Sequence, residues 1–345
     1  MSQKSLSYHD YNVEIPATEE PSPLLYWLSL LFVTLGIAGM GIFVEADKLT
    51  QGMPFEQLLS HKLISYANLL LVGSGLLYVA HLWFTAGVVG KWATGLATAG
   101  AIGVSAALLA RWFESYHVLQ EGHAPITNLY EVTVLFSAIT VVLYLAMESV
   151  YRTRSAGAFV MPIVLSAVLF EIWLVSNGQA NPSNLMPALK SYWMHAIVLA
   201  NFIGYGAFAV AAGAGIMYLL RARAERRGRP DAFALRVLPG LQQIDDLIFK
   251  SIAVGFPVFT LATILGAAWA YDAWGGYWSW DPKETWSLIV WLTYATYFHL
   301  RYVKGWEGAR MAWWVILGFG VTLTLFCFLG VNLFLSGLHS YGQLG

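Results

Sequence analysis

At positions 274–286 the chain reads Trp274-Gly-Gly-Tyr-Trp278-Ser-Trp280-Asp281-Pro-Lys-Glu-Thr-Trp286, and an apolar run follows. Tryptophan is large and amphipathic, so several of them in one turn favour a position at a membrane boundary. Two interpretations stay open at this point. The segment is either an aromatic platform for a flat ligand, or part of the aromatic belt that many membrane proteins carry.

The residues after Trp280 have the pattern of a helix start. Asp281 is suited to the N-cap and Pro282 to the first helical position, while Glu284 lies three residues after the cap. Side chains at these positions satisfy amide groups that have no partner inside the helix. We therefore expect a helix from about Pro282, with the tryptophans held rigidly at its start.

The composition around this segment is that of an integral membrane protein. Of 345 residues, 58% are apolar and 11% are charged, and the mean hydropathy is +0.59; soluble domains carry about 25% charged residues. Runs long enough to cross a bilayer, about 20 residues each, predict an all-α bundle of about nine transmembrane helices. These runs are 24–44, 63–86, 92–113, 128–150, 157–176, 191–220, 249–270, 285–303 and 310–337.

The basic residues predict the orientation of this bundle. Most of the 19 Lys and Arg residues fall in alternate connections, chiefly 221–236 and 301–310. Only five fall on the other side: Lys48, Lys62, Arg111, Lys190 and Lys283. Because cytoplasmic loops carry the excess of Lys and Arg, we expect the N-terminus inside, the C-terminus outside, and the tryptophan segment outside.

Several functional classes are excluded. The net charge is −1 and no basic run is interleaved with aromatics, so nucleic-acid binding is not expected. The single cysteine, Cys327, lies inside an apolar run and is expected to be buried. One cysteine rules out an internal disulfide and a Cys-x-x-Cys redox site in this chain.

Histidines in or beside membrane spans are candidates for function. His339 follows the last run and His195 begins the run 191–220, so both are expected outside, at the level of the tryptophans. Neutral imidazoles beside a flat aromatic surface are suited to the axial ligation of heme iron.

A second pair of histidines is expected deeper in the membrane. His299 lies 17 residues after Pro282, about 25 Å along a helix. His81, 18 residues after Leu63, falls at a similar depth on another helix. Each histidine alone is equally consistent with a core histidine bonded to a polar neighbour, or with one at the inner surface.

Another outer segment has a capping pattern. Asn128 and Glu131 are spaced to cap the helix that starts there, and His123 precedes them as a loop histidine. Glu131 and Glu171 are expected to face protein or a cavity rather than lipid.

The segment 274–286 resembles the tryptophan-rich WWD motif of the heme-handling proteins of cytochrome c maturation. Within that superfamily, blocks 122–131, 186–193, 269–299 and 337–342 are similar to the CcsA type of the System II synthase, called CcsB or ResC in some naming schemes. The resemblance divides the chain into 1–62, with a tail, an extra transmembrane helix and an outer loop, and 63–345, the heme-handling domain.

The resemblance implies a function. Such proteins move heme b outward, hold it against the outer tryptophans and present its vinyl groups to the Cys-x-x-Cys-His of an apocytochrome c, as part of a holocytochrome c synthase. The implied partners are a CcsB/ResB-type membrane subunit and thiol reductants that act on the apocytochrome. The implied location is the bacterial cytoplasmic membrane, with the platform facing the periplasm or cell exterior, or a thylakoid membrane.

The resemblance also implies the residues of the site. His339 and His195 would be the outer ligands of the heme iron, and His299 would ligate heme within the membrane, opposite His81 or a histidine of a partner subunit. The porphyrin would be held by these residues of the motif: Trp274, Trp278, Trp280, Asp281 and Trp286.

One position departs from the family pattern. The family has its first outer histidine four residues after the Trp of the Pro-Ala-Leu-x-Ser-x-Trp block, but residue 197 is Ile and the histidine is His195, two residues after Trp193. Two residues turn a side chain by about 200° around a helix, so His195 is expected to face another direction, and His123 becomes a reserve candidate.

Two other functions use similar residues. A b-type electron-transfer cytochrome would also carry histidines on helices, but it has no use for the outer tryptophan segment. A heme exporter without ligase activity would use the same sites, and it is the alternative that the sequence leaves open.

Overall fold

The computed structural model describes residues 29–41, 58–84, 87–118, 122–181, 191–228 and 232–335, and all regular structure within them is helical. A short helix, Ser29–Gly41, comes first. The others are α2 (Leu59–Phe84), α3 (Gly87–Val118), α4 (Leu129–Tyr151), α5 (Gly157–Ser176), α6 (Tyr192–Arg226), α7 (Phe233–Val237), α8 (Leu241–Trp274), α9 (Pro282–Lys304), α10 (Ala309–Leu317), η3 (Gly318–Gly330) and α11 (Val331–Leu333).

The predicted all-α membrane bundle is confirmed. Within the described ranges, seven helices are long and apolar enough to cross a membrane: α2, α3, α4, α5, α6, α8 and the continuous helix Ala309–Leu333. The other two predicted runs fall on the short helix Ser29–Gly41 and on α9. With 23 residues, α9 is about 34 Å long, so its length suits a crossing, whereas charged residues at both ends lower its hydropathy.

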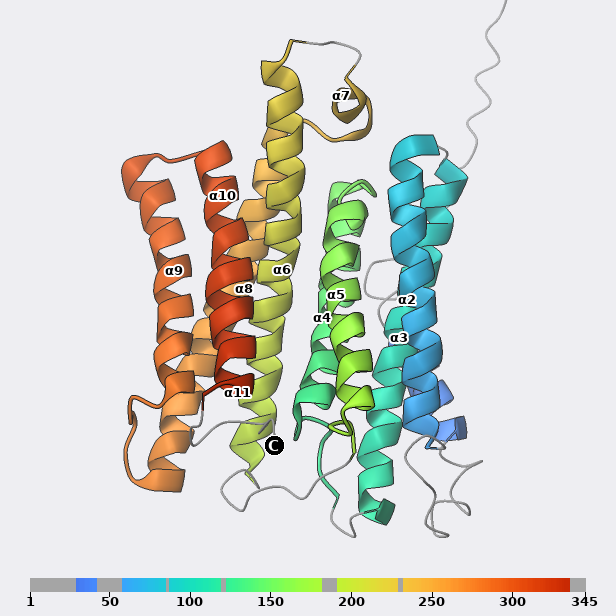
Figure 1. The fold of residues 1–345 in the computed structure, drawn as a ribbon, viewed down its shortest axis with the longest axis vertical. Helices are drawn as coiled ribbons and strands as arrows, with labels where there is room; N and C mark the ends of the chain where they lie inside the picture. The colour runs from blue at the N-terminus through green and yellow to red at the C-terminus, as the bar shows by residue number, and fades with distance from the viewer. Residues whose placement is uncertain are drawn as a thin grey trace, which may run out of the picture.

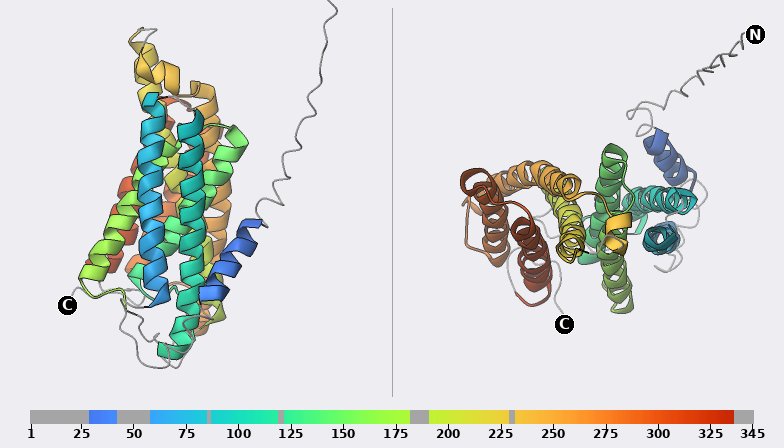
Figure 2. Two further views of the ribbon diagram at one scale, coloured as in Figure 1. Left: turned by 90° about the vertical axis from the view of Figure 1, so that its right-hand side faces the viewer. Right: turned by 90° about the horizontal axis from the view of Figure 1, so that it is seen from above.

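The helices form two groups that run along the long axis of the molecule (Figure 1). In one group, α2 packs on α3 and α5, and α4 packs on α3 and α5. In the other, α6 packs on α8 and α10, and α9 packs on α8 and η3. Contacts of α6 with α4 and α5 join the groups, and the view from above shows α9 and α2 on opposite sides of the bundle (Figure 2).

Small residues allow α6 and α8 to approach closely. A Cβ atom added at Gly204 would lie 2.8 Å from the Cβ of Phe259, and one added at Gly255 would lie 2.7 Å from the Cβ of Ala207. Helices in membranes associate through such small-residue contacts. These small residues therefore allow α6 and α8 to pack closely against each other.

The two ends of the bundle differ in charge. The connection between α8 and α9, which carries the tryptophan segment, lies at the lower end in Figure 1, whereas α7 lies at the upper end. Basic residues gather at the α7 end. Arg221 donates there to the carbonyls of Leu235 (2.8 Å) and Leu238 (3.0 Å), and Arg301 forms a 2.6 Å ion pair with Asp245.

The last described span contains an unusual helix. Between α10 and α11, the 13 residues of η3 form a π-helix, in which each amide donates to the carbonyl five residues earlier. π-Helical turns are rare and occur often at functional sites. Cys327 and Phe328 of η3 line the cavity described below.

Candidate functional site

The tryptophan segment is a short connection closed by caps at both ends. Helix α8 ends at Trp274, and its C-cap residue Gly275 has a φ of 77° and donates its amide to the carbonyl of Tyr271 (2.8 Å). Asp281 is the N-cap of α9 and accepts from the backbone amide of Lys283 (2.9 Å), with Pro282 first in the helix. The predicted helix start is confirmed, and the caps fix both ends of the connection.

Two side chains brace the middle of the connection. The Glu284 carboxylate accepts from the amide (2.7 Å) and the hydroxyl (3.1 Å) of Ser279, two residues before the cap. The Thr285 hydroxyl donates to the carbonyl of Trp280 (3.3 Å), which has a φ of 59°. A left-handed conformation at so large a residue is strained, and such strain persists only where surrounding contacts impose it.

A cavity lies beneath this connection, between α4, α6, α8, α9 and the last span. The enclosed volume of this cavity is about 140 Å³, and one side of it is open. Its lining is mostly apolar with a few polar groups: Val132, Met194, Ile197, Val198, Asn201, Phe202, Tyr205, Ala262, Thr263, Gly266, Ala267, Trp269, Tyr277, Trp278, Lys283, Glu284, Ser287, Cys327, Phe328 and Asn332.

The four predicted tryptophans take different positions. Trp278 lines the cavity, and Trp280, 70% exposed, packs edge-on against it with ring centroids 5.9 Å apart. Trp274 packs edge-on against Trp269, which lines the cavity (4.7 Å). Trp286 stacks on Phe326 of η3 (4.7 Å, planes 3° apart) and is not among the lining residues.

The face of α6 that lines the cavity does not include His195. The lining residues Met194, Ile197, Val198 and Asn201 recur at helical spacing along one stripe. The exposed His195 lies outside this stripe, with its ring 6.2 Å from that of Trp112 in α3. The position that faces the cavity is therefore residue 197, an isoleucine.

The other predicted histidines are placed as follows. His339 lies outside the described residues. His81 is half-buried near the end of α2, where a Cβ added at Gly90 of α3 would lie 3.1 Å from its Cε1 atom. His299 is exposed on α9. Helices α2 and α9 lie on opposite sides of the bundle, so the structure does not bring His81 and His299 together (Figures 1 and 2).

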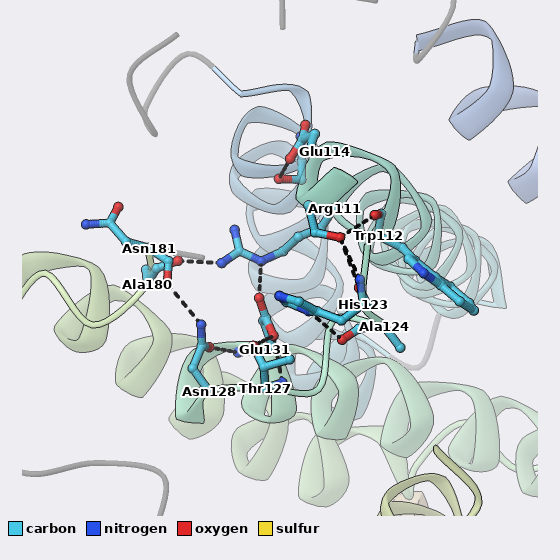
Figure 3. A network of polar contacts seen from close by, with 12 residues as sticks. Arg111, Trp112, Glu114, His123, Ala124, Thr127, Asn128, Glu131, Ala180 and Asn181 are labelled. Atoms are coloured by element: carbon cyan, nitrogen blue, oxygen red, sulfur yellow. Dashed lines mark hydrogen bonds and ion pairs between the residues drawn. The ribbon is translucent and has the colours of Figure 1, made fainter. Parts of the chain in front are cut away.

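A buried ion pair joins α3 to α4 and also holds the turn that follows α5 (Figure 3). Arg111 of α3 and Glu131 of α4 are 2% and 1% exposed, with a 2.6 Å contact between Nε and Oε1. Arg111 also donates to the carbonyl of Ala180, after α5 (2.5 Å). The other carboxylate oxygen of Glu131 accepts from the amide and the hydroxyl of Thr127, both at 2.8 Å. Glu131 faces protein, as expected.

Asn128 completes this network and confirms its predicted capping role. Its side chain accepts from the amide of Glu131 (2.9 Å) and donates to the carbonyl of Asn181 (3.1 Å). His123 lies nearby and is half-buried; its backbone amide donates to the hydroxyl of Ser115 (3.1 Å). Together these contacts hold the turn at 177–181 against the start of α4, ahead of the chain that leads into α6.

Sequence reasoning missed several residues of the lining, chiefly Ile197, Trp269, Lys283 and Asn332. Lys283 and Trp269 lie inside the block 269–299, which resembles the family. Ile197 carries a detectable signal, because it shares helical spacing with Met194 and Asn201. Asn332 follows the π-helix, where ordinary helical spacing does not apply.

Comparison with known proteins gives the family. Residues 126–339 match the family described as "Cytochrome C assembly protein". Three relatives are each named "Cytochrome c biogenesis protein CcsA". The protein of Guillardia theta is 38% identical over 265 residues, which cover 70% of this chain and 83% of the relative. That of Gloeobacter violaceus is 32% identical over 324 residues (80% and 93%), and that of Chlamydomonas reinhardtii is 36% identical over 238 residues (68% and 64%).

A solved structure has a similar fold. The "Cytochrome c Heme Lyase CcmF" aligns with a TM-score of 0.60 at 19% sequence identity, over 80% of this chain and 48% of that one. This chain thus spans about half the length of CcmF, and the likeness concerns the fold. From the matched residues and these relatives, the chain belongs to the cytochrome c assembly protein family and takes part in cytochrome c biogenesis.

Proposed function

We propose that this chain holds heme b in the cavity beneath the tryptophan segment and presents it for covalent attachment to an apocytochrome c. The observation that carries this proposal is the cavity itself, an apolar cleft roofed by Tyr277 and Trp278 and braced by the caps of α8 and α9. An apolar pocket with a few polar groups suits a large, flat, mostly apolar ligand.

The chemistry assigns the reacting groups to two molecules. A cysteine thiol of the apocytochrome adds across a heme vinyl group, so that an S–C bond forms and the thiol proton passes to the other vinyl carbon. Such a reaction needs acceptor thiols, and the single cysteine of this chain is buried at 4% exposure. The chain therefore acts as the presenter, and the Cys-x-x-Cys-His of the apocytochrome, kept reduced by thiol reductants, supplies the thiols.

We further propose that the tryptophan end faces the periplasm, the cell exterior or a thylakoid lumen. The gathering of basic residues at the α7 end supports this orientation, because inner loops carry the excess of Lys and Arg. We also propose that His299 of α9, whose side chain is exposed, ligates heme at the inner end together with a residue from a CcsB/ResB-type partner subunit.

Co-expression distinguishes a synthase from a heme exporter. The chain is produced with a CcsB/ResB-type partner and a secreted apocytochrome c, and covalent heme on the acceptor is detected by heme staining after denaturing electrophoresis. We expect covalent heme that depends on this chain. An acceptor that carries only extractable heme would contradict attachment and support export; an acceptor whose Cys-x-x-Cys cysteines are replaced by alanine is the control.

Substitution separates the two candidate positions on α6. We expect His195→Ala to leave the absorption spectrum of co-purified heme unchanged, because this side chain lies outside the cavity stripe. Ile197→His should instead shift the spectrum toward a low-spin bis-histidine form, because residue 197 faces the cavity. If His195→Ala lost the wild-type spectrum, that result would show that His195 is an outer ligand of the heme iron.

A further inference from the structure

A second cavity, which we call the lateral cleft, lies between α5 and η3 and is bounded by α4 and α6. Figure 1 shows α5 and the last span on opposite sides of α6. The lateral cleft encloses about 390 Å³ and is open on one side. Ligand cavities in proteins have volumes of about 300–1,000 Å³, so the lateral cleft is large enough to hold a guest.

The lining of the lateral cleft is mostly apolar, and no described residue of it is charged. Five of its members are phenylalanines: Phe136, Phe170, Phe202, Phe319 and Phe328. Among the polar members, the hydroxyls of Thr133 and Ser166 already donate to carbonyls of their own helices, both at 2.7 Å. Water finds few partners in such a space, and a charged guest would leave its charge unpaired. The lining therefore matches a hydrocarbon.

The open side of the lateral cleft faces the bilayer. Ser166 lines the cleft but is exposed, and it lies at the middle of the 20 residues of α5. This helix is about 30 Å long, which equals the thickness of the hydrocarbon core, so its middle lies at the depth of the lipid chains. Nearby Leu169 of α5 and Leu325 of η3 are 67% and 52% exposed, as expected of a surface that faces lipid.

We propose that the lateral cleft binds one acyl chain of a bilayer phospholipid, whose headgroup stays at the membrane surface, and that this chain supports a wall of the cavity beneath the tryptophan segment. Phe202, Tyr205 and Phe328 line both cavities. The ring of Phe328 meets that of Phe202 edge-on (6.3 Å) and that of Phe170 in the same way (6.5 Å). A chain behind these rings holds them in place. The supporting role rests on the proposed function, whereas the lipid site does not.

The retention of lipid by the purified chain tests the binding site. The full chain is extracted in detergent, washed to remove loosely held lipid and measured by native mass spectrometry. We expect the wild type to retain one phospholipid per chain. Ser166→Phe places a ring in the open side of the cleft, and Ala167→Phe fills the cleft from the same helix. Both variants should retain at least about tenfold less phospholipid.

Leu169→Phe is the matched control for lipid retention. It adds a ring at another exposed position of α5, and Leu169 is not among the lining residues. Its retention of phospholipid should equal that of the wild type.

A heme titration tests the supporting role. The washed chain is titrated with heme in detergent, with and without added phospholipid, and binding is followed by the Soret band. We expect phospholipid to tighten heme binding by at least about fivefold, the lower end of the coupling between two sites in one protein. Heme binding by Ser166→Phe should not respond to phospholipid, whereas Leu169→Phe should respond as the wild type does.

The outcomes separate the lipid site from its role and from the proposed function. A wild type that retains no phospholipid, or retains a quinone in its place, would overturn the lipid site, as would full retention in both cleft variants. Heme binding that ignores phospholipid, or that responds equally in Ser166→Phe, would overturn the supporting role. A chain that retains phospholipid but binds no heme would overturn the proposed function and leave the lipid site standing.

Discussion

Replacing Arg111 with alanine should lower the free energy of unfolding by about 3–5 kcal/mol, because it leaves the carboxylate of Glu131 buried without its counter-ion. Glu131 is 1% exposed, and its contact with Arg111 is 2.6 Å. The loss can be measured as a fall in the midpoint of thermal unfolding of the detergent-solubilised chain, followed by intrinsic fluorescence.

Two control variants show whether the buried charge is the cause. The double variant Arg111→Met/Glu131→Leu removes both charges and should recover much of the loss, because an apolar pair of similar volume often replaces a buried ion pair at little cost. Glu225→Gln disturbs a more exposed pair, with Arg221 at 2.8 Å, and should change stability by about 0.5 kcal/mol or less. A double variant as unstable as Arg111→Ala would contradict the explanation.

The Arg111 variant should also affect the cavity. Arg111 and Asn128 hold the carbonyls of Ala180 and Asn181, which precede the chain leading into α6. Glu131 directly precedes Val132, which lines the cavity, so a disturbed start of α4 changes the lining. A stability network thus lies next to the proposed heme site at the same end of the bundle.

Replacing His339 with alanine should abolish covalent attachment of heme to the co-expressed apocytochrome, while heme still co-purifies with the chain through an inner site. No described residue of the cavity lining is a histidine, although iron held there needs an axial ligand. His339 lies seven residues after Asn332, which lines the cavity. Seven residues reach at most about 25 Å, enough to return to the site. Heme staining of the acceptor measures attachment.

The matched control for this experiment is His123→Ala. His123 is the reserve candidate for an outer ligand, and its side chain is half-buried beside the Arg111 network. We expect attachment to persist in this variant. Unchanged attachment in His339→Ala, or its loss in His123→Ala alone, would show that the outer ligand has been assigned to the wrong histidine.

Local features of this protein could be predicted from the sequence. The caps at Asn128 and Asp281 depend on residues within three positions of each other, and both are confirmed. The helical runs depend on hydrophobic length alone, and each predicted run coincides with a helix of the described chain.

Features that depend on which helices are neighbours could not be predicted. His81 and His299 match in depth along their helices, but depth does not specify the neighbour that a side chain faces, and α2 and α9 lie apart. The distribution of Lys and Arg places Arg111 among the charges of the outer connections. In the structure, Arg111 is buried against Glu131, which lies 20 positions further along the chain. The lining residue Asn332 was missed because it follows a π-helix.

The π-helix makes the length of the last span matter as much as its composition. An α-helix advances about 100° per residue, and a π-helix advances less because its bonds span five residues, so deleting one residue from η3 changes the rotation of everything that follows. Asn332 would then leave the cavity, and the chain toward His339 would start in another direction. Between Gly318 and Gly330, single-residue deletions should therefore be tolerated far less well than apolar substitutions.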